Sequence, residues 1–456
     1  MKPNFGNWLS ASVTGVKFED LDGDGQPREP DEPGLPDWTI YVDYNDNDIR
    51  DAIEPYAVTG NNGRYTIGGI RPGIWKVREE LQEGWTNTYP PSGYYEQTFV
   101  AGQTETGLDF GNFERVTLVG RKFNDLDGGG TDNGGTEPGQ GGVTINLYRD
   151  ANGNGTLELD TDTLVDSTTT TPVTGVYSFD DLGPGTYFVQ EIVPNGWTPT
   201  APLGPNYYSV TATSGGIYTG RDFGNFADVT IHGRKFNDLD GDGTDNGGTE
   251  PGQGGVTINL YQDANGNGTL DMGEDTFVDS TVTDTVTGNY AFDDLGPGTY
   301  FVQETVSAGS SLTVPLNPDY HIVAAVSGGE YAGRDFGNFV NVPILGRKFN
   351  DLDGDGTDNG GAEPGQGGVT INLYRDANGN MTLEVGEDTF LDSTVTDTVT
   401  GNYAFDDLGP GTYFVQETVP AGSTLTMPLN PNYHIVTAIS GGEYTGRDFG
   451  LSLIHI

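Results

Sequence analysis

Cysteine is absent from this 456-residue chain. Its absence excludes disulfides, thiolate metal sites and thiol redox chemistry. Cationic residues are scarce: 20 Lys and Arg stand against 67 Asp and Glu, and the net charge of −47 repels nucleic acids and anionic membranes. No apolar run is long enough to span a bilayer. We therefore expect no nucleic-acid partner and no membrane span within this chain.

Segments rich in Leu, Ala, Lys and Glu at helical spacing are missing as well. The hydrophobic residues, 34% of the chain, include many Val, Ile, Tyr and Phe, which fit the half-buried surface of a sheet. The four histidines are scattered, and no repeat combines a nucleophile, a base and an oxyanion hole. The composition predicts an all-β protein that is not an enzyme.

A repeat with a period of 113 residues organises the chain. The run Gly-Arg-Lys-Phe-Asn-Asp-Leu-Asp begins at Gly120, Gly233 and Gly346, and a diverged first copy begins near Gly15. Such periodicity is typical of tandem arrays of domains. The predicted domains are repeat 1 at 10–113, repeat 2 at 114–226, repeat 3 at 227–339 and a truncated repeat 4 at 340–450.

Both ends of the sequence look interrupted. Residues 4–8 match the end of a repeat, so 1–9 is interpreted as the remnant of a preceding repeat. Residues 451–456 read like the translation of a sequencing adapter and are interpreted as an artefact. We therefore expect the chain to be a window on a longer protein, with its export signal and anchor outside the fragment.

Alternating apolar runs predict seven short strands in each repeat. In the third repeat they are separated by Asn-Gly, Pro-Gly and Gly-Gly turns, and they fall at 229–236, 256–261, 276–283, 289–292, 299–306, 320–326 and 331–339. Seven short strands in about 113 residues indicate an Ig-like β-sandwich. The chain is thus predicted to be a tandem array of β-sandwich domains.

The first acidic loop of each repeat follows its opening strand. Carboxylates at alternate positions of a tight, Gly-containing turn bring several oxygens around one point, and hard cations such as Ca²⁺ take oxygen ligands. A Glu twelve residues after the first Asp closes the loop, and in repeat 2 Gly129 replaces one Asp. The predicted calcium ligands are Asp20, Asp22, Asp24 and Glu32; Asp125, Asp127 and Glu137; Asp238, Asp240, Asp242 and Glu250; and Asp351, Asp353, Asp355 and Glu363.

The second acidic loop follows the next strand and has the ligand spacing of an EF-hand loop, although strands flank it. Repeat 3 is complete, whereas repeat 1 has Asp48 and repeat 4 has Met381 at the Gly position, and repeat 2 has Thr161 in place of the final Glu. The predicted ligands are Asp43, Asn45, Asn47, Asp51 and Glu54; Asp150, Asn152, Asn154 and Glu158; Asp263, Asn265, Asn267, Asp271 and Glu274; and Asp376, Asn378, Asn380, Glu384 and Glu387. The alternative is that both kinds of loop are metal-free Asx turns.

The sequence resembles a known family. The run from Gly288 to Glu304, GNYAFDDLGPGTYFVQE, together with the DxDGDG and DxNxNG loops before it, is similar to the B domains of serine-aspartate-repeat bacterial surface proteins. More distantly it resembles the B-type domains of collagen-binding adhesins. The resemblance covers residues 10–450 and implies a prealbumin-like β-sandwich, calcium binding, a cell-surface or secreted location, and a stalk or adhesion role.

The adhesin domains also carry Lys–Asn isopeptide bonds promoted by Glu, and the resemblance implies candidate residues for such a bond here. They are Lys17, Glu79 and Asn112; Lys122, Glu191 and Asn225; and Lys235, Glu304 and Asn338. In repeat 4 Leu451 stands where the Asn is expected. The alternative is a lysine that reaches solvent at the sandwich edge and an Asn in a turn.

Two functions remain open from the sequence. One is a calcium-stiffened extracellular spacer that projects a domain outside this fragment, and that domain would bind a glycan or a matrix or host protein. The other is a binding module, in which the repeats themselves engage such a partner.

Overall fold

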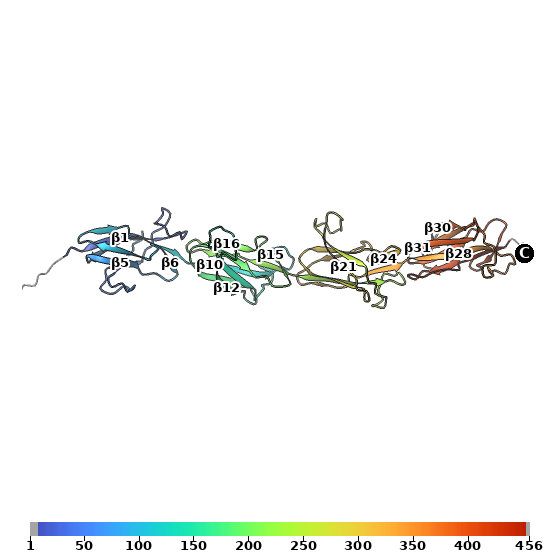
Figure 1. Ribbon diagram of the computed structural model, residues 1–456, viewed down its shortest axis with the longest axis horizontal. Coiled ribbons are helices and arrows are strands. Elements are labelled where there is room, and N and C mark those ends of the chain that lie inside the picture. The colour runs from blue at the N-terminus through green and yellow to red at the C-terminus, as the bar shows by residue number, and fades with distance from the viewer. Residues whose placement is uncertain (1–7, 453–456) are drawn as a thin grey trace, which may run out of the picture. The chain divides into compact units, whose positions relative to one another are not determined.

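A computed structural model describes residues 8–452. Most of the predicted N-terminal remnant and residues 453–456 of the predicted adapter segment lie outside this range. Every regular element within it is a β-strand (Figure 1), so the all-β prediction is confirmed. None of these described residues forms a helix long and apolar enough to cross a membrane.

Residues up to Ala227 form one compact unit with two β-sandwiches. The strands of the first sandwich are β1 (Ala11–Glu19), β2 (Thr39–Asp43), β3 (Tyr56–Val58), β4 (Arg64–Ile70), β5 (Gly73–Glu79), β6 (Trp85–Tyr89), β7 (Tyr94–Phe99), β8 (Thr104–Thr106) and β9 (Phe110–Glu114). Those of the second are β10 (Val116–Asn124), β11 (Thr144–Arg149), β12 (Thr163–Thr169), β13 (Val176–Leu182), β14 (Thr186–Glu191), β15 (Trp197–Ala201), β16 (Tyr207–Thr211), β17 (Ile217–Tyr218) and β18 (Phe223–Ala227).

Residues from Asp228 onward form the other unit, again with two sandwiches. The strands of the third sandwich are β19 (Val229–Asn237), β20 (Thr257–Gln262), β21 (Thr276–Val282), β22 (Asn289–Leu295), β23 (Thr299–Glu304), β24 (Ser310–Val314), β25 (His321–Ala324), β26 (Glu330–Tyr331) and β27 (Phe336–Val340). Those of the fourth are β28 (Val342–Asn350), β29 (Thr370–Arg375), β30 (Thr389–Val395), β31 (Asn402–Leu408), β32 (Thr412–Glu417), β33 (Thr424–Met427), β34 (His434–Thr437) and β35 (Phe449–Ser452).

Each sandwich packs two sheets against each other. In the first sandwich one sheet has the order β4-β1-β9-β6, with β8 beside β1, and the other has the order β3-β2-β5-β7. The opening strand changes partner along its length: Ser12 to Thr14 pair with β8, whereas Lys17 to Glu19 pair with the last strand, β9, both in parallel. This exchange places the lysine near the end of the first strand beside the strand that carries the predicted Asn.

Side chains of alternating strand positions fill the space between the sheets. Along β1 the burial alternates from Ala11 to Lys17, and Phe18 is buried as well. Val13 packs with Ile40, Ile67, Val77 and Phe110 in one hydrophobic cluster. The alternation expected from the sequence is therefore the one that builds the core.

The strands predicted for the third repeat agree with the structure except at two places. Strand β24 (Ser310–Val314) had not been predicted, and the run predicted at 331–339 is split into β26 and β27. The split occurs because the chain leaves the sheet around Gly333, whose φ of 68° is unfavourable for other residues.

Candidate cation-binding loops and buried lysine sites

The first acidic loop begins directly after the opening strand of each sandwich, and its first Asp shapes the loop. Asp238 is fully buried and accepts hydrogen bonds from the backbone N–H of Gly241 at 2.6 Å and of Gly243 at 2.8 Å. Gly243 has a φ of 80°, a conformation that glycine adopts readily. The buried carboxylate therefore closes the loop into a ring of oxygens.

Three carboxylates converge in the first loop of all four sandwiches. In each set one oxygen per residue lies within 4.8 Å of the others, and the sets are Asp20, Asp22 and Asp24; Asp125, Asp127 and Glu137; Asp238, Asp240 and Glu250; and Asp351, Asp353 and Asp355. Oxygens that share one Ca²⁺ at 2.3–2.6 Å can be at most about 5 Å apart. The donor chemistry and the spacing therefore fit one hard cation per loop.

The Glu predicted to close the first loop is buried in every repeat. The structure buries Glu32, Glu137, Glu250 and Glu363. Glu363, for example, accepts a hydrogen bond from the backbone N–H of Leu352 at 3.0 Å. Burial raises the pKa of Glu250 and of Glu32, because a carboxylate without a nearby cation is poorly solvated there.

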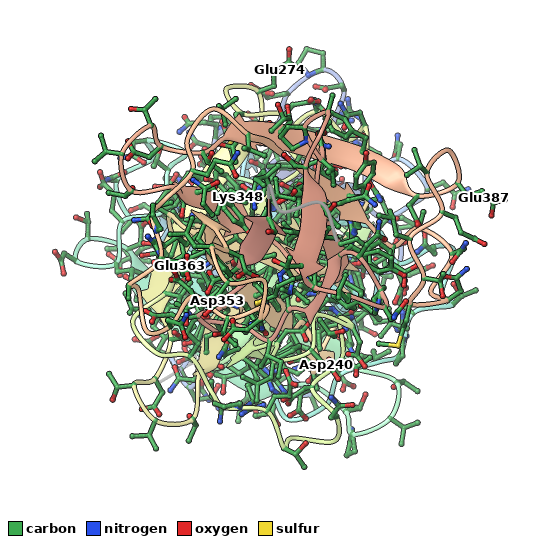
Figure 2. The ribbon with its side chains drawn as sticks, turned by 90° about the vertical axis from the view of Figure 1, so that its right-hand side faces the viewer. Asp240, Glu274, Lys348, Asp353, Glu363 and Glu387 are labelled. Carbon is green, nitrogen blue, oxygen red and sulfur yellow. The ribbon has the colours of Figure 1, made fainter. Side chains whose placement is uncertain are left out.

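The second loop of the third repeat has the same local architecture. Asp263 accepts hydrogen bonds from Gly266 N–H at 2.7 Å and Gly268 N–H at 2.9 Å. The amide of Asn267 donates to Asp271 at 2.6 Å. Four of the predicted ligands thus lie on one tight turn, and the fifth, Glu274, accepts a hydrogen bond from the amide of Asn265 at 3.1 Å. Glu274 is exposed and is labelled at the rim of the ribbon in Figure 2.

A carboxylate that was not predicted closes this second loop. Asp275 accepts hydrogen bonds from Ala264 N–H at 3.1 Å and Asp271 N–H at 2.7 Å. Asp162 and Asp388 do the same in repeats 2 and 4, so the loop of repeat 2 is framed although it lacks the final Glu. The three residues are spaced by one repeat period, and aligning the repeats would have identified them.

In the first repeat, Glu54 occupies that framing position. It accepts from Tyr44 N–H at 2.6 Å and from Asp51 N–H at 2.9 Å. Asn45 and Asn47 turn their amides toward Asp51, at 2.8 and 3.2 Å. These predicted residues therefore contact one another.

Two basic residues of the neighbouring strand β5 also reach the second loop of the first repeat. Arg78 pairs with Asp43 and with Asp46 at 3.0 Å each, and with Asp48. Lys76 lies 2.6 Å from Asp46, and these contacts lower the pKa of Asp46. The protein itself thus supplies positive charge to this loop, which the sequence had not predicted.

The second loop of the fourth repeat keeps the turn despite its substituted glycine. Met381 adopts a φ of 57° and donates its N–H to Asp376 at 2.9 Å. The amides of Asn378 and Asn380 donate to Glu384 at 3.1 and 3.0 Å. Glu387 is exposed and points away from the ribbon in Figure 2.

The lysine at the end of each opening strand is fully buried. Lys17, Lys122, Lys235 and Lys348 have no exposed surface, which excludes the alternative of a lysine that reaches solvent. Burial lowers the pKa of each to about 8, because the ammonium loses its hydration. Figure 2 shows Lys348 within the ribbon of its sandwich.

In the second and third repeats the predicted Glu contacts both partners. Glu304 lies 3.5 Å from Lys235 Nζ and accepts a hydrogen bond from the Asn338 amide. In repeat 2, Glu191 lies 3.9 Å from Lys122 Nζ and accepts from the amide of Asn225. Burial raises the pKa of both glutamates.

The first and fourth repeats differ at this site. Glu79 lies 2.9 Å from Lys17 Nζ, but its amide donor is Asn87 at 3.1 Å, and Asn112 contacts Asn87 instead. In the fourth repeat Leu451 replaces the Asn, and Glu417 lies 3.5 Å from Lys348 Nζ. No described residue donates a hydrogen bond to either oxygen of Glu417, and burial raises its pKa to about 7.

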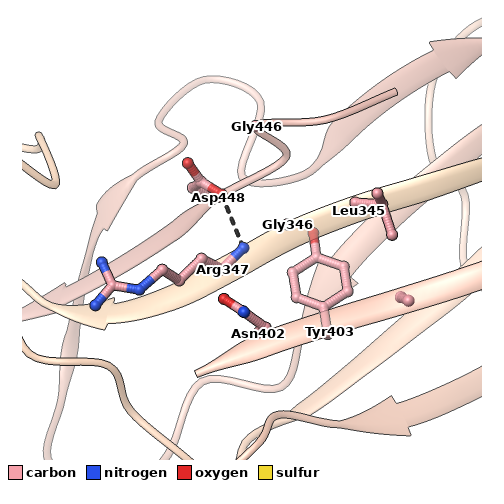
Figure 3. A pocket seen from close by; sticks show the side chains of 8 residues that line it. Leu345, Gly346, Arg347, Asn402, Tyr403, Gly446 and Asp448 are labelled. Atoms are coloured by element: carbon pink, nitrogen blue, oxygen red, sulfur yellow. Dashed lines mark hydrogen bonds between the residues drawn. The ribbon is translucent and has the colours of Figure 1, made fainter. Parts of the chain in front are cut away.

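A groove of about 590 Å³ is lined by the paired strands β28 and β31 and by Gly446 and Asp448 of the segment before β35 (Figure 3). Its polar groups serve the fold: Asp448 accepts the Arg347 N–H at 2.8 Å, and the Tyr403 hydroxyl donates to the carbonyl of Arg447.

Comparison with known proteins identifies relatives of these repeats. Residues 117–208 and 344–432 match the family model of the SdrD B-like domain. The chain is 28% identical over 454 residues to serine-aspartate repeat-containing protein D of Staphylococcus aureus (strain Newman), covering 91% of this chain and 31% of that protein. It is 26% identical over 316 residues to protein F of Staphylococcus epidermidis (strain ATCC 12228 / FDA PCI 1200), covering 65% of this chain and 18% of that protein.

Among solved structures, the Bacillus anthracis TIE protein is similar, with a TM-score of 0.32 and 13% sequence identity. The alignment covers 99% of this chain and 76% of the TIE chain. The chain spans about a third or less of the length of the two staphylococcal proteins. The second and fourth repeats thus match the SdrD B-like domain, and the resemblance of the chain to the B domains of serine-aspartate-repeat proteins is confirmed.

Proposed function

We propose that the chain is a calcium-stiffened spacer of an extracellular, adhesin-like bacterial surface protein, and that it has no catalytic role. The observation that carries this proposal is the convergence of three carboxylates within 4.8 Å in the first loop of every sandwich. Only oxygen donors meet there, and such sites suit Ca²⁺ at the millimolar concentrations found outside cells. The likeness to serine-aspartate-repeat proteins supports the surface location.

Bound calcium would stiffen the array in two ways. Each ion would tie the loop carboxylates to the end of a core strand, because Asp238 follows β19 directly. Eight divalent ions, one for each acidic loop, would also offset about a third of the net charge of −47, and the loss of self-repulsion favours a compact chain.

Calorimetric titration of the chain with CaCl₂ tests this proposal. We expect saturable binding with dissociation constants on the order of 0.1 to 1 mM, and weaker binding of Mg²⁺. The double variant Asp238→Asn/Asp240→Asn should lose one site, whereas Asp319→Asn, an exposed acid outside the loops of the same repeat, should lose none. Absence of saturable calcium binding by the chain would contradict the proposal.

We further propose that the second and third repeats are cross-linked internally. A neutral Lys235 Nζ would attack the amide carbon of Asn338, so that an N–C bond forms, the C–Nδ2 bond breaks and ammonia leaves. Glu304 contacts both groups and, when protonated, can polarise the amide and relay the proton of the lysine. The set Lys17, Glu79 and Asn112 stays a prediction, because Asn112 contacts Asn87 and not Glu79.

Intact mass spectrometry with peptide mapping tests the cross-link. We expect the loss of one ammonia from each of the second and third repeats and a branched peptide that joins Lys235 to Asn338. Glu304→Gln should restore the full mass of its repeat. The fourth repeat, with Leu451, is an internal control that must keep its full mass. Unmodified masses in repeats 2 and 3 would remove the cross-link and leave the calcium proposal untouched.

A further inference from the structure

The first acidic loop of the first repeat contacts the second repeat. The backbone N–H of Ser214, in the turn before β17, donates to the carbonyl of Leu21 at 2.9 Å. The Ser214 hydroxyl accepts the N–H of Glu114 at 2.7 Å, and Gly215 N–H donates to the Glu114 carbonyl at 2.9 Å. One Ser-Gly turn therefore holds both the loop and the last strand of the preceding sandwich.

The same contacts join the third and fourth repeats. Ser440 N–H donates to the Leu239 carbonyl at 2.9 Å, and its hydroxyl accepts the N–H of Val340 at 2.7 Å. Gly441 N–H donates to the Val340 carbonyl at 2.8 Å. Here the serine hydroxyl also lies 2.6 Å from the side-chain oxygen of Asn237, which ends the opening strand of the third repeat.

A proline of the following repeat packs against a glycine of the same loop at each joint. A Cβ on Gly23 would lie 2.1 Å from Cβ of Pro184, and a Cβ on Gly241 would lie 2.0 Å from that of Pro410. Two carbon atoms that are not bonded to each other do not approach so closely in proteins, so only glycine fits at this position. The position requires glycine for a second reason, since both residues have a φ near 70°.

We propose that the Ser-Gly turn and this proline form a latch by which the second repeat grips the first acidic loop of the first repeat, and the fourth repeat grips that of the third. Two joints with the same hydrogen bonds and the same glycine–proline contact support a built interface. The contacts shared by the two joints are to backbone groups, so the latch recognises the conformation of the loop more than its side chains.

If the first acidic loop binds calcium, as the proposed function requires, the latch makes the contact between the two repeats depend on that ion. Leu21 lies between Asp20 and Asp22, and the N–H of Gly23 donates to Asp20 at 2.7 Å. A cation that holds these carboxylates also holds the carbonyl and the glycine that the next repeat grips. Calcium would then fix the angle between repeats as well as the stability of each one.

Hydrogen exchange of the full chain, followed by NMR or by mass spectrometry with single-residue fragmentation, tests the latch. In calcium we expect the amides of Ser214 and Ser440 to exchange at least a hundredfold more slowly than free amides, since both donate across a joint. In chelator their exchange should quicken at least tenfold, while the core amide of Val189 changes little. If both serine amides exchange like free amides in calcium, the latch is wrong.

The double variant Ser214→Ala/Ser440→Ala sharpens the test. Loss of the hydroxyl acceptors should speed exchange at Glu114 and Val340, whereas Ser178→Ala, at an exposed serine on β13, should leave both amides unchanged. Unaltered exchange at Glu114 and Val340 in the double variant would contradict the latch. Equal protection of Ser214 and Ser440 in calcium and in chelator would support the latch and overturn only its control by the ion.

Discussion

The second acidic loops of the first and third repeats form the same turn but differ in how their negative charge is compensated. Asp43 accepts the N–H groups three and five residues further on, as Asp263 does. In the first repeat Arg78 and Lys76 extend from β5 into the loop. In the third repeat the corresponding strand, β23, carries Phe and Gln at those positions, so the strand contributes no cation.

We therefore expect metal binding to depend on the charge that a neighbouring strand supplies as well as on the loop motif. Carboxylates crowded on one turn need positive charge, which either a bound ion or a protein side chain can supply. In the first repeat the Arg78 side chain is only 14% exposed and Asp43 is fully buried. We therefore expect the second loop of the first repeat to depend least on calcium, and the second loop of the third repeat to depend on it strongly.

The largest effect is expected from Arg78→Gln, which gives the first repeat the residue of the third. Removing one partner of a mostly buried pair should destabilise the first repeat by about 2 to 4 kcal/mol in chelator, and calcium should restore part of the loss. Tryptophan fluorescence follows this repeat selectively, because four of the five Trp lie in residues 1–113. Arg64→Gln, at an exposed position, is the matched control. An unchanged fluorescence-detected melting curve for Arg78→Gln would show that Arg78 does not stabilise the first repeat by compensating the charge of this loop.

A smaller effect is expected from Asp275→Asn in the third repeat. The amide keeps the shape but cannot accept both backbone N–H groups equally well, so we expect a loss of about 1 to 3 kcal/mol with or without calcium. Glu274→Gln should change the stability in chelator less, since Glu274 is exposed and the glutamine oxygen can still accept the hydrogen bond from Asn265. Calorimetry that ranks Glu274→Gln as the more harmful change in chelator would show that Asp275 does not frame the loop.

The reverse exchange, Gln303→Arg, tests whether an arginine on β23 competes with calcium in the third repeat. An arginine on β23 should weaken calcium binding at the second loop of the third repeat about tenfold, or about 1.4 kcal/mol, because it competes with the ion. Gln303→Met, long but uncharged, is the control for packing. Titration with CaCl₂ decides, and equal affinities in the two variants would be evidence against competition by charge.

The smallest effect is expected from Met381→Gly in the fourth repeat. Met381 holds a φ of 57°, which costs a residue with a side chain about 1 kcal/mol relative to Gly. The glycine variant should therefore raise the thermal midpoint of this repeat by a few degrees. Met272→Gly, at an exposed position without positive φ, should bring no such gain. A fall in midpoint for Met381→Gly would show that the Met side chain contributes more than its backbone costs.

Much of the fold followed from the sequence because strands and turns leave local signals. Alternation and Gly-rich turns located most strands of the third repeat, whereas for Lys235 the sequence left open a cross-linked lysine and a lysine that reaches solvent. Strand β24 was missed because its sequence, Ser-Ser-Leu-Thr-Val, begins with two small polar residues and gives a weak period-two pattern.

The site was less predictable where partners come from distant strands. The contact of Arg78 with Asp43 depends on the register that pairs Val42 with Val77 across two strands, and no local motif encodes it. The EF-hand spacing predicts Glu274 as the closing residue of the loop, whereas the carboxylate that accepts the backbone hydrogen bonds is Asp275, one residue later. Motif spacing therefore predicted where the loops lie, whereas the pairing of distant strands determines which side chains compensate the negative charge of each loop.

Thermal unfolding of the whole chain, with about 5 mM calcium and then with chelator, shows whether calcium stabilises the array. At roughly ten times the expected dissociation constant, each filled site contributes about 1.4 kcal/mol. We predict that circular dichroism, which follows all repeats, shows midpoints several degrees higher in calcium, with magnesium much less effective. Midpoints that are the same in calcium and in chelator would contradict a calcium-stiffened spacer and identify the acidic loops as metal-free turns.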